Sequence, residues 1–388
     1  MSNPFTPGAG YYPPHLAGRE GTIARFRKHL QRAKKTPHHF VLTGLRGTGK
    51  TVLLSEFQRV CQEEGWLCVR RELFEAEAET ELMGKAVLAD LLRAATAASA
   101  GTKAIETARR LALALKPRQV GAFGLSYSPT YATEPPPPLR DQLVHSLSEI
   151  APMITRRHQG LVLLYDEFHE VWDGRRRHAT PLATFFGAVK QAQLQGFPVV
   201  VVACGLPPVA VNIVRSRSYL ERDLTVETLG NLSNDDARAA ITRPLGSVGV
   251  AFTERLVDAI VADTRGYPYF LQYYGWFLLD ILPKAGELDL DLFHELRPLL
   301  LEGLDRGFFA GHYAKLPRVE REALRAIARL GDRARVAAIP WHGNYAVLRA
   351  SVSRLVERGQ LYRPSERGEV AFSLPLYRDY LRRVGEDL

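Results

Sequence analysis

The sequence predicts an α/β fold, in which a parallel β-sheet lies between two layers of helices and precedes a helical region and a small C-terminal module. Two continuous apolar runs, at residues 40–43 and 161–165, suit strands buried on both faces of such a sheet. The pattern becomes helical from Leu229, and two helical stretches followed by two short strand-like stretches occupy the last 72 residues, from Pro317. We therefore expect three domains, with boundaries at 1–228, 229–312 and 313–388.

The first apolar run leads directly into a glycine-rich turn and then a helical pattern. The turn reads Gly44-Leu45-Arg46-Gly47-Thr48-Gly49-Lys50-Thr51 and matches G-x-x-x-x-G-K-[ST]. Glycines allow the backbone N–H groups to surround a phosphate, and the start of the following helix brings its positive dipole end to the anion. Lys50 suits contact with the β- and γ-phosphates, and the Thr51 hydroxyl suits a magnesium ion. We interpret all eight residues as a nucleotide-binding loop.

The second apolar run ends in two acids, Asp166 and Glu167. Ligands of open α/β sheets bind at the carboxyl ends of the strands, so these acids are expected beside the glycine turn. Asp166 is suited to hold Mg²⁺, and Glu167 to polarise the water that attacks the γ-phosphate. The alternative is a helix-capping or solvated pair of acids. The combination with the glycine turn favours an ATPase, because no N-K-x-D motif for reading guanine is present.

Bulk properties limit the classes of protein that remain. The 388 residues contain 46% hydrophobic residues, which is ordinary for a folded globular protein. The three cysteines form no C-x-x-C pair, which favours a reducing compartment and disfavours a zinc site. No signal peptide and no run long enough to cross a membrane is evident. We expect a cytoplasmic protein.

Other stretches give coarser expectations. An amphipathic helix is expected from residue 20, and a strand at 197–204 should lie beside the acidic strand. A hairpin or projecting loop is expected at 116–133, and a stiff polyproline spacer at 135–138. The tetrad Arg175-Arg176-Arg177-His178 could contact a polyanion or a neighbouring subunit. The alternative is that it forms a solvated loop.

The net charge of +9 is unevenly distributed. Residues 313–388 contain 15 Lys and Arg against 9 Asp and Glu, whereas residues 229–312 contain 7 against 12. A basic C-terminal part favours a polyanionic partner, for which duplex DNA is the expected class, although a basic excess also occurs on ordinary solvated surfaces.

The C-terminal part resembles a winged helix in its order of elements. Helices are expected at 317–330 and 345–358, and short strands at 361–363 and 369–373 flank a turn-rich basic tip. Such modules bind DNA or dock on proteins, and the sequence leaves both open. Under the DNA interpretation, the second helix would present its exposed face and the tip would form the wing, through Arg349, Ser351, Ser353, Arg354, Arg363 and Arg367.

Taken over nearly its whole length, the chain resembles the STAND and origin-recognition-like branch of the AAA+ ATPases, which are P-loop NTPases with a helical lid and a C-terminal winged helix. The residues that carry this resemblance are Leu16-Ala17-Gly18-Arg19-Glu20, the turn at 44–51, Tyr165-Asp166-Glu167, Cys204-Gly205-Leu206-Pro207 and Gly266-Tyr267-Pro268-Tyr269-Phe270-Leu271-Gln272.

The resemblance implies further roles. Gly18 and Arg19 would lie against the adenine or ribose, and Pro268 would cover the base. Cys204 stands where such proteins often have a polar or arginine sensor, and Tyr267-Pro268-Tyr269 stands where origin-recognition-type ATPases carry an arginine, so neither sensor is assigned. Arg222 is placed where an arginine finger could reach a neighbouring subunit, or it forms a surface ion pair.

The expected function is hydrolysis of Mg·ATP, with Lys50, Asp166 and Glu167 as catalytic residues and Thr51 and Asp166 as metal ligands. Nucleotide state would control the lid, the winged helix, DNA binding and possibly assembly into a homo-oligomer. The alternative is a STAND-type signalling or scaffold switch, for example in phage defence, that recruits a protein partner. A replication-initiator-like loader is a third possibility, which the missing lid arginine disfavours.

Overall fold

The computed structural model describes residues 3–8, 10–98, 137–281, 287–364 and 368–386, which fall into two compact units. The sheet unit consists of Gly21–Thr43 and Leu53–Thr228. The loop unit consists of Met1–Glu20, Gly44–Val52 and Leu229–Leu388. The glycine turn at 44–51 therefore belongs to the same unit as the helical region and the C-terminal module.

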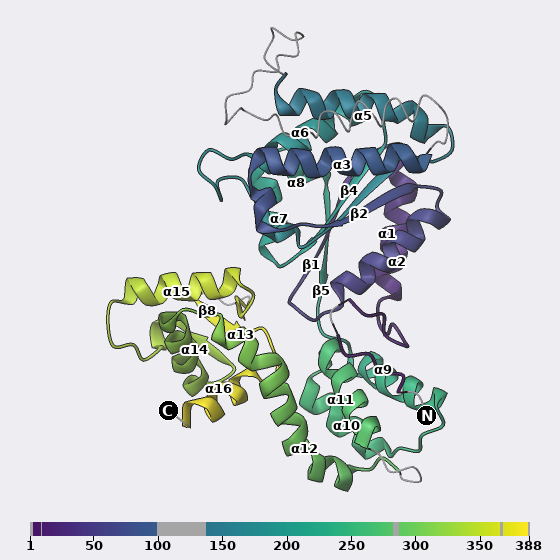
Figure 1. Ribbon diagram of the computed structural model, residues 1–388. Helices are drawn as coiled ribbons and strands as arrows, with labels where there is room; N and C mark the ends of the chain where they lie inside the picture. The colour runs from purple at the N-terminus through teal and green to yellow at the C-terminus, as the bar shows by residue number, and fades with distance from the viewer. Residues whose placement is uncertain (1–2, 9, 99–136, 282–286, 365–367, 387–388) are drawn as a thin grey trace, which may run out of the picture. The chain divides into compact units, whose positions relative to one another are not determined.

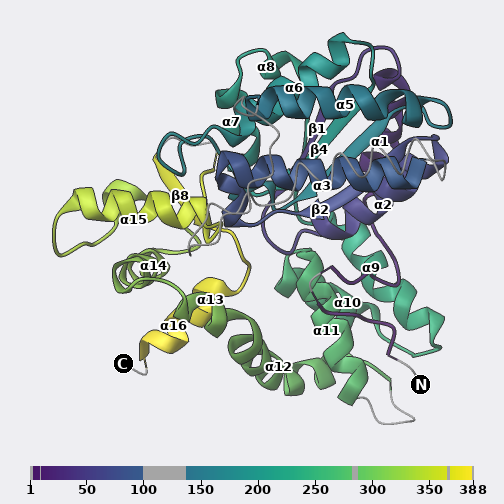
Figure 2. The same ribbon diagram turned by 45° about the horizontal axis from the view of Figure 1, so that its top comes forward.

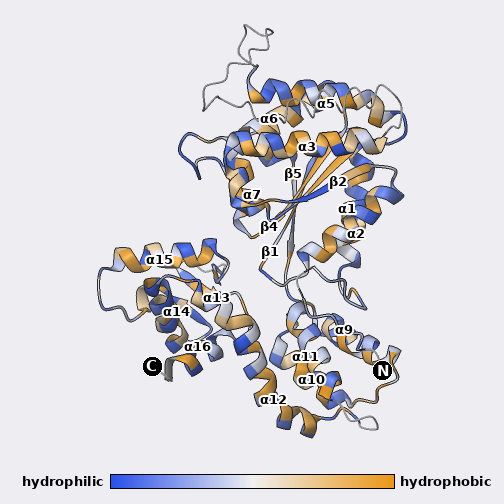
Figure 3. Ribbon diagram, viewed as in Figure 1, coloured by the Kyte–Doolittle hydropathy of each residue, from blue (hydrophilic) through white to orange (hydrophobic). Residues whose placement is uncertain are grey.

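The sheet unit is built on the five-stranded sheet shown in Figure 1, whose strand order is β2-β3-β4-β1-β5. Strand pairs β1–β4, β2–β3 and β3–β4 are parallel, as expected. All residues of β1, β3 and β4 are buried, which explains why these strands are continuous apolar runs (Figure 3). The strands are β1 (His39–Gly44), β2 (Leu67–Glu72), β3 (Leu161–Asp166), β4 (Val199–Gly205) and β5 (Leu224–Leu229).

Helices cover both faces of this sheet (Figure 2). On one face Phe26 of α1 stacks on Phe57 of α2 with ring centroids 3.9 Å apart, and both contact Phe40 of β1. The other face is covered by α3, α5 and α6, whose apolar residues share a core with β3 and β4. The helices of the unit are α1 (Glu20–Ala33), α2 (Lys50–Glu63), α3 (Thr80–Ala98), α5 (Leu139–Thr155), α6 (Pro181–Leu194), α7 (Pro208–Ser216) and α8 (Leu220–Asp223), with short 3₁₀ turns η1 (Glu75–Ala78) and η2 (Phe168–Glu170).

The register of the sheet places the ends of three strands at one edge. Thr43 of β1 is paired with Gly205 of β4, and Tyr165 of β3 is paired with Ala203. Asp166 and Glu167 follow directly, so the two acids lie at the carboxyl edge from which the chain leaves β1. The expected hairpin or loop at 116–133 lies outside the described residues, as does the start of the polyproline segment.

The loop unit contains three helices that begin with clear sequence signals. Ser233 caps α9 (Asn234–Ser247) by accepting a hydrogen bond from Asp236 N, and Thr253 caps α10 (Glu254–Thr264) in the same way. The chain then turns at Gly266, where an added Cβ would lie 2.4 Å from the Leu232 carbonyl oxygen, and Pro268 begins α11 (Pro268–Ile281).

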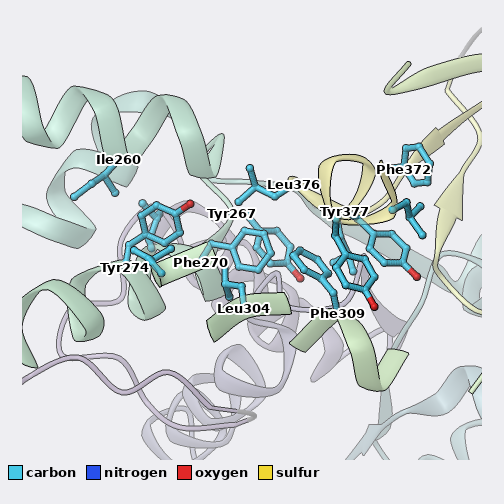
Figure 4. Close-up of a cluster of buried hydrophobic side chains, with 14 of the residues drawn as sticks. Ile260, Tyr267, Phe270, Tyr274, Leu304, Phe309, Phe372, Leu376 and Tyr377 are labelled. Carbon is cyan, nitrogen blue, oxygen red and sulfur yellow. The ribbon is translucent and has the colours of Figure 1, made fainter. Parts of the chain in front are cut away.

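A long helical run joins this region to the C-terminal module. It consists of α12 (Leu290–Leu304), the π-helical turn η3 (Asp305–Phe309) and α13 (Ala310–Ala314), so the expected boundary between residues 312 and 313 lies inside α13. One hydrophobic core extends from Tyr274 and Phe270 of α11 through Phe309 of η3 to Phe372 and Tyr377 (Figure 4).

The C-terminal module has the expected elements and two that were not expected, the strand β6 (Arg333–Arg335) and the helix α16 (Tyr377–Glu386). Helices α14 (Arg318–Leu330), α15 (Tyr345–Glu357) and α16 pack with an antiparallel sheet of order β6-β8-β7. Strands β7 (Leu361–Tyr362) and β8 (Glu369–Phe372) form the expected wing, and β6 adds a third strand. The fold is therefore the predicted α/β core with a helical region and a winged-helix module.

Within the described part of the chain, no helix combines the length and the apolar character that a membrane crossing requires. The three cysteines all lie in described segments, and no disulfide joins them.

Candidate functional site

The backbone of the glycine turn requires glycine at two positions. Gly47 and Gly49 have φ values of +71° and +87°, which side chains with a Cβ rarely adopt. An added Cβ at Gly47 would lie 2.0 Å from the Tyr267 hydroxyl oxygen, so glycine is also required there by space. At Gly49 an added Cβ would meet no atom within 4 Å, so this side of the turn is open.

Four carbonyl groups of the turn are held by side chains of the loop unit. Lys50 Nζ donates to the carbonyls of Gly44 and Leu45 at 3.0 and 2.8 Å. The Tyr267 hydroxyl donates to the carbonyl of Arg46 at 2.6 Å, and Arg19 donates to that of Thr48 at 3.0 Å. Because the C=O and the next N–H of a trans peptide point in opposite directions, the N–H groups of residues 45, 46, 47 and 49 point away from these donors. This orientation fits a phosphate.

Tyr267 was not expected to contact the turn. Its side chain is fully buried, and burial raises the pKa of its phenol well above the usual value, so the hydroxyl remains a neutral donor. The motif Gly266-Tyr267-Pro268 drew attention to this position, but its partner, the Arg46 carbonyl, is 221 residues away in sequence.

Gly18 and Arg19 lie beside the turn in the same unit. Arg19 is 8% exposed, and besides Thr48 it donates to the carbonyl of Gly230 at 2.9 Å, so its guanidinium ties the turn to the chain after β5. Gly18 has a φ of +64°, and an added Cβ would lie 2.5 Å from the Asp236 carboxylate. Their contact with adenine or ribose, and that of Pro268, stays a prediction.

Asp166 is 5% exposed and lies between a backbone donor and a cation. One carboxylate oxygen accepts from Glu167 N at 2.9 Å, and the other lies 3.9 Å from the Arg70 guanidinium. Arg70 in turn donates to the Ser55 hydroxyl of α2 at 2.9 Å. The hard oxygens of the carboxylate are chemically suited to a magnesium ion or its water. Arg70, which would compete with a metal for this charge, was not singled out by sequence reasoning.

Glu167 is held in an unusual backbone conformation. Its φ of +50° is in the left-handed region, which costs a residue other than glycine on the order of 1 kcal/mol. Its side chain is 37% exposed, and one of its carboxylate oxygens lies 3.2 Å from Nδ1 of His169. The sharp turn directly after β3 thus directs an acid outward at the carboxyl edge of the sheet.

A buried polar network supports the strand that carries these acids. The Tyr165 hydroxyl donates to Asp90 at 2.9 Å, and Arg71 of β2 donates to both oxygens of the same carboxylate at 2.8 and 2.9 Å. Asp90 is fully buried, and burial followed by the nearby Asp90 charge raises the pKa of Tyr165. The network fixes the position of β3 relative to β2 and α3.

The predicted DNA-contacting residues have different environments. Arg349 and Arg363 are exposed and Ser353 is half-buried, whereas Arg367 lies outside the described residues. Arg354 is 46% exposed and donates to the buried Glu320 carboxylate at 2.8 Å. Ser351 was expected on the exposed face, and this was wrong: it is fully buried, because it shares the inward face of α15 with Leu348, Val352 and Leu355.

Two other predicted basic sites, the tetrad at 175–178 and Arg222, lie in the sheet unit. In the tetrad at 175–178, Arg175 pairs with Glu170 at 2.8 Å and lies over the Trp172 ring, and Arg176 pairs with Glu75 at 3.4 Å. Arg222 is exposed on α8, and Cys204 is fully buried at the end of β4. Contact of Arg222 or the tetrad with another molecule stays a prediction.

Comparison with known protein families identifies two regions. Residues 15–202 match the family model of the AAA ATPase domain, and residues 306–381 match a domain of unknown function, DUF8462. A comparison with curated proteins finds no match. Residues 15–202, which include the glycine turn, are thus similar to the AAA ATPase domain.

Solved structures share the overall fold at low sequence identity. The Walker-type ATPase PABY2304 of Pyrococcus abyssi matches with a TM-score of 0.57 and 14% identity over 95% of this chain and 96% of that chain. The ORC2 protein of Aeropyrum pernix, solved as ADPNP–ADP complexes, matches with a TM-score of 0.55 and 15% identity over 98% and 96%. Both likenesses extend over the helical region and the winged-helix module.

Proposed function

We propose that this protein binds Mg·ATP at the glycine turn and hydrolyses it. The observation that carries the proposal is the pair of carbonyls, of Arg46 and Thr48, held by Tyr267 and Arg19, which directs the N–H groups of residues 47 and 49 to the opposite side, where a phosphate would bind. The AAA ATPase match over residues 15–202 supports the same substrate class. Thr51 and Asp166 would hold Mg²⁺, which would neutralise part of the phosphate charge and draw electron density from the γ-phosphate.

The roles of the side chains follow from their chemistry. On binding, Lys50 would exchange its carbonyl partners for phosphate oxygens, which are stronger acceptors for an ammonium ion. Glu167 would accept a proton from the attacking water as the new O–P bond forms and the bond to the β-phosphate oxygen breaks. Adenine or ribose would lie against Gly18, Arg19 and Pro268.

Measurement of phosphate release and of ATP binding in the same variants tests this assignment. Glu167→Gln should bind ATP with an affinity within about threefold of the original protein, and should lower kcat by at least about 100-fold. Glu81→Gln, which makes the same change at an exposed position of α3, is the matched control and should retain most of the activity. Unchanged phosphate release in Glu167→Gln would show that another group activates the water.

We further propose that nucleotide state is communicated to the C-terminal module through the loop unit. Tyr267, which bonds to the glycine turn, packs on Phe270 with ring centroids 4.6 Å apart, and Phe270 contacts Phe309 at 5.8 Å. Phe309 stacks on Tyr377 of α16 with ring centroids 5.4 Å apart (Figure 4). It also stacks on Tyr380 of the same helix, at 5.3 Å. This aromatic series supports coupling, because a ligand that shifts Tyr267 changes the packing of rings that belong to both parts.

Duplex DNA is the proposed partner of the winged-helix module, with Arg349, Ser353, Arg354, Arg363 and Arg367 as contacts. The basic excess of residues 313–388 supports a polyanion. Affinity should fall steeply with salt concentration, and Arg349→Ala combined with Arg363→Ala should weaken binding and reduce the slope of log K against log salt by about 2. Arg306→Ala, which removes an exposed arginine of η3, serves as the control.

A second candidate function is a STAND-type switch that recruits a protein, and one observation favours it. Tyr345 and Val347 are each 43% exposed at the start of α15, near the helix face proposed to meet DNA. Exposed apolar side chains favour protein contact more than contact with phosphates. Absence of salt-dependent DNA binding, together with binding of a protein partner that Val347→Asp abolishes, would favour this function.

A further inference from the structure

His169 lies directly beside the proposed catalytic acid. Its ring Nδ1 is 3.2 Å from Oε2 of Glu167, and its Nε2 is 3.6 Å from Oε1 of Glu170. The imidazole is 8% exposed, whereas the Glu167 side chain is 37% exposed. A buried polar ring thus contacts an acid that reaches toward solvent.

We propose that His169 is the positioning residue of Glu167: the 3.2 Å contact between Nδ1 and Oε2, which a small rotation of either side chain would align as a hydrogen bond, directs Oε1 toward the attacking water. This inference rests on the proposed function, because it assumes that Glu167 activates water. It adds a residue that neither the sequence motif nor the AAA ATPase family match assigns.

The position of the ring is fixed by the fold. His169 is part of η2, the short turn after β3, and its neighbour Phe168 is fully buried in the core of the sheet unit. On the side of β4, an added Cβ at Gly205 would lie 3.0 to 3.3 Å from His169, including 3.2 Å from Nδ1. Glycine at the end of β4 therefore makes room for the ring beside Glu167.

Glu167 needs such a support because its backbone alone does not fix its side chain. The left-handed φ of +50° sets the direction of the Cα–Cβ bond, but three side-chain torsions remain, and a half-exposed carboxylate samples several rotamers. A close polar contact with a buried ring restricts this freedom. Correct orientation of a general base contributes to rate, since the proton acceptor must lie within hydrogen-bonding reach of the water.

Glu170 completes the arrangement from the other side of the ring. Its carboxylate faces Nε2 of His169 and also accepts from Arg175 at 2.8 Å, so it is held in place by a cation. Carboxylate–imidazole contacts of this kind orient rings elsewhere in enzymes. The order Arg175, Glu170, His169 and Glu167 is thus a chain of contacts that ends at the proposed base.

The hydrolytic step leaves the protonation of His169 unchanged. The water oxygen forms the new bond to the γ-phosphorus, the bond from that phosphorus to the β-phosphate oxygen breaks, and the water proton passes to Oε1 of Glu167. His169 keeps its Nδ1 proton throughout. Its contribution is therefore to kcat and not to ATP affinity.

Two isosteric substitutions separate this role from a merely structural one. In His169→Asn the amide NH₂ occupies nearly the position of Nδ1, whereas in His169→Gln it reaches only the position of Nε2. We expect His169→Asn to keep kcat within about fivefold of the original protein, and His169→Gln to lower kcat by 10-fold to 100-fold with KM changed by less than about twofold. Thermal unfolding and ATP binding of both variants report whether the fold is retained.

A double variant tests whether the two residues act as one. In the Glu167→Gln background, His169→Gln should cause no further loss of kcat. Equal kcat values for His169→Asn and His169→Gln, or multiplicative losses in the double variant, would overturn the inference. If Glu167→Gln alone leaves phosphate release unchanged, the proposed function fails instead, so the two failures are distinguishable.

Discussion

Lys50 is the residue on which nucleotide affinity should depend most. In the structure its ammonium group has two backbone carbonyl partners within the turn, and phosphate oxygens would replace them. We expect Lys50→Met, which keeps most of the side-chain volume, to weaken ATP binding by about 10-fold to 100-fold, since a charge-assisted contact contributes roughly 1.5–3 kcal/mol. Fluorescence titration with an ATP analogue measures this, and Lys28→Met, on the exposed face of α1, should leave affinity unchanged. Equal affinities of the two variants would contradict the proposed site.

Tyr267 offers a second test at the scale of one atom. Tyr267→Phe removes only the hydroxyl that donates to the Arg46 carbonyl and leaves that partly buried acceptor without this donor. We expect the free energy of unfolding to fall by about 1–2 kcal/mol and ATP affinity to decrease, because the turn loses one of its supports. Thermal unfolding with and without ATP measures both effects. Tyr11→Phe, at a position 67% exposed, is the matched control and should behave as the original protein.

The sequence predicted the residues of the site that belong to contiguous motifs. The glycine turn, Asp166 and Glu167 are each recognisable because their chemistry requires a fixed local spacing. Tyr267, Arg70 and His169 are different. Tyr267 acts through a contact between residues far apart in sequence, Arg70 through the pairing of β2 with β3, and His169 through the left-handed turn at Glu167. No local pattern encodes these three contacts.

At the scale of elements, α14 and α15 are joined by a buried ion pair. The Glu320 carboxylate is 1% exposed and is contacted by Arg354 at 2.8 Å and Arg358 at 3.5 Å. We expect Arg354→Ala to lower the free energy of unfolding by about 1–3 kcal/mol, because it leaves a buried charge with one weaker partner. Arg349→Ala, on the same helix, should change it by less than about 0.5 kcal/mol. Urea denaturation followed by circular dichroism distinguishes them, and equal midpoints would show that the ion pair does not stabilise the module.

The sequence predicted the elements that have a clear apolar run or a capping residue. It did not predict the strands that lack both. β1, β3 and β4 are apolar throughout because both of their faces are buried, and α9 and α10 begin at capping residues. β5 was missed, since most of its residues are partly or fully exposed and its sequence is polar. β6 has only three residues and pairs with a strand 36 positions away. Its extended conformation therefore depends on this pairing and not on a pattern in its own sequence.

At the scale of the whole molecule, the buried His39 and the half-buried His29 should make stability depend on pH. Burial lowers the pKa of His39 to about 3 and that of His29 to about 4. The unfolded chain binds these protons near pH 6.5, so between pH 6.5 and these values it carries more protons than the folded chain. The free energy of unfolding should therefore fall as pH is lowered through this range, by up to ~1.4 kcal/mol per pH unit for each histidine.

His39→Asn isolates one of these contributions. The amide oxygen of asparagine can accept the hydrogen bond that Val201 N donates to Nδ1 of His39, and it does not titrate. We expect a shallower fall in thermal midpoint between pH 6.5 and 4 than in the original protein. His145→Asn, which replaces a largely exposed histidine, should keep the original slope. Parallel curves for all three proteins would show that His39 is not held neutral.

Coupling between nucleotide and the C-terminal module is also a property of the whole chain. Phe309→Leu shortens the aromatic series where the helical region meets α16, whereas Phe293→Leu makes the same change at a similarly buried position outside it. We expect both variants to bind ATP, and Phe309→Leu alone to reduce the effect of ATP on DNA affinity by more than half. By linkage, the effect of DNA on ATP affinity should fall by the same factor. Equal coupling in both variants would exclude this route.

The grouping of the glycine turn with Leu229–Leu388 has a practical consequence for dissecting the gene. A fragment ending at residue 228 would contain every residue proposed to bind phosphate or magnesium, yet it would lack Gly230 and Tyr267, two of the groups that hold Arg19 and Arg46 in place. An inactive fragment would thus not show that the nucleotide-binding residues were wrongly assigned. Activity is best mapped with single substitutions in the full-length chain.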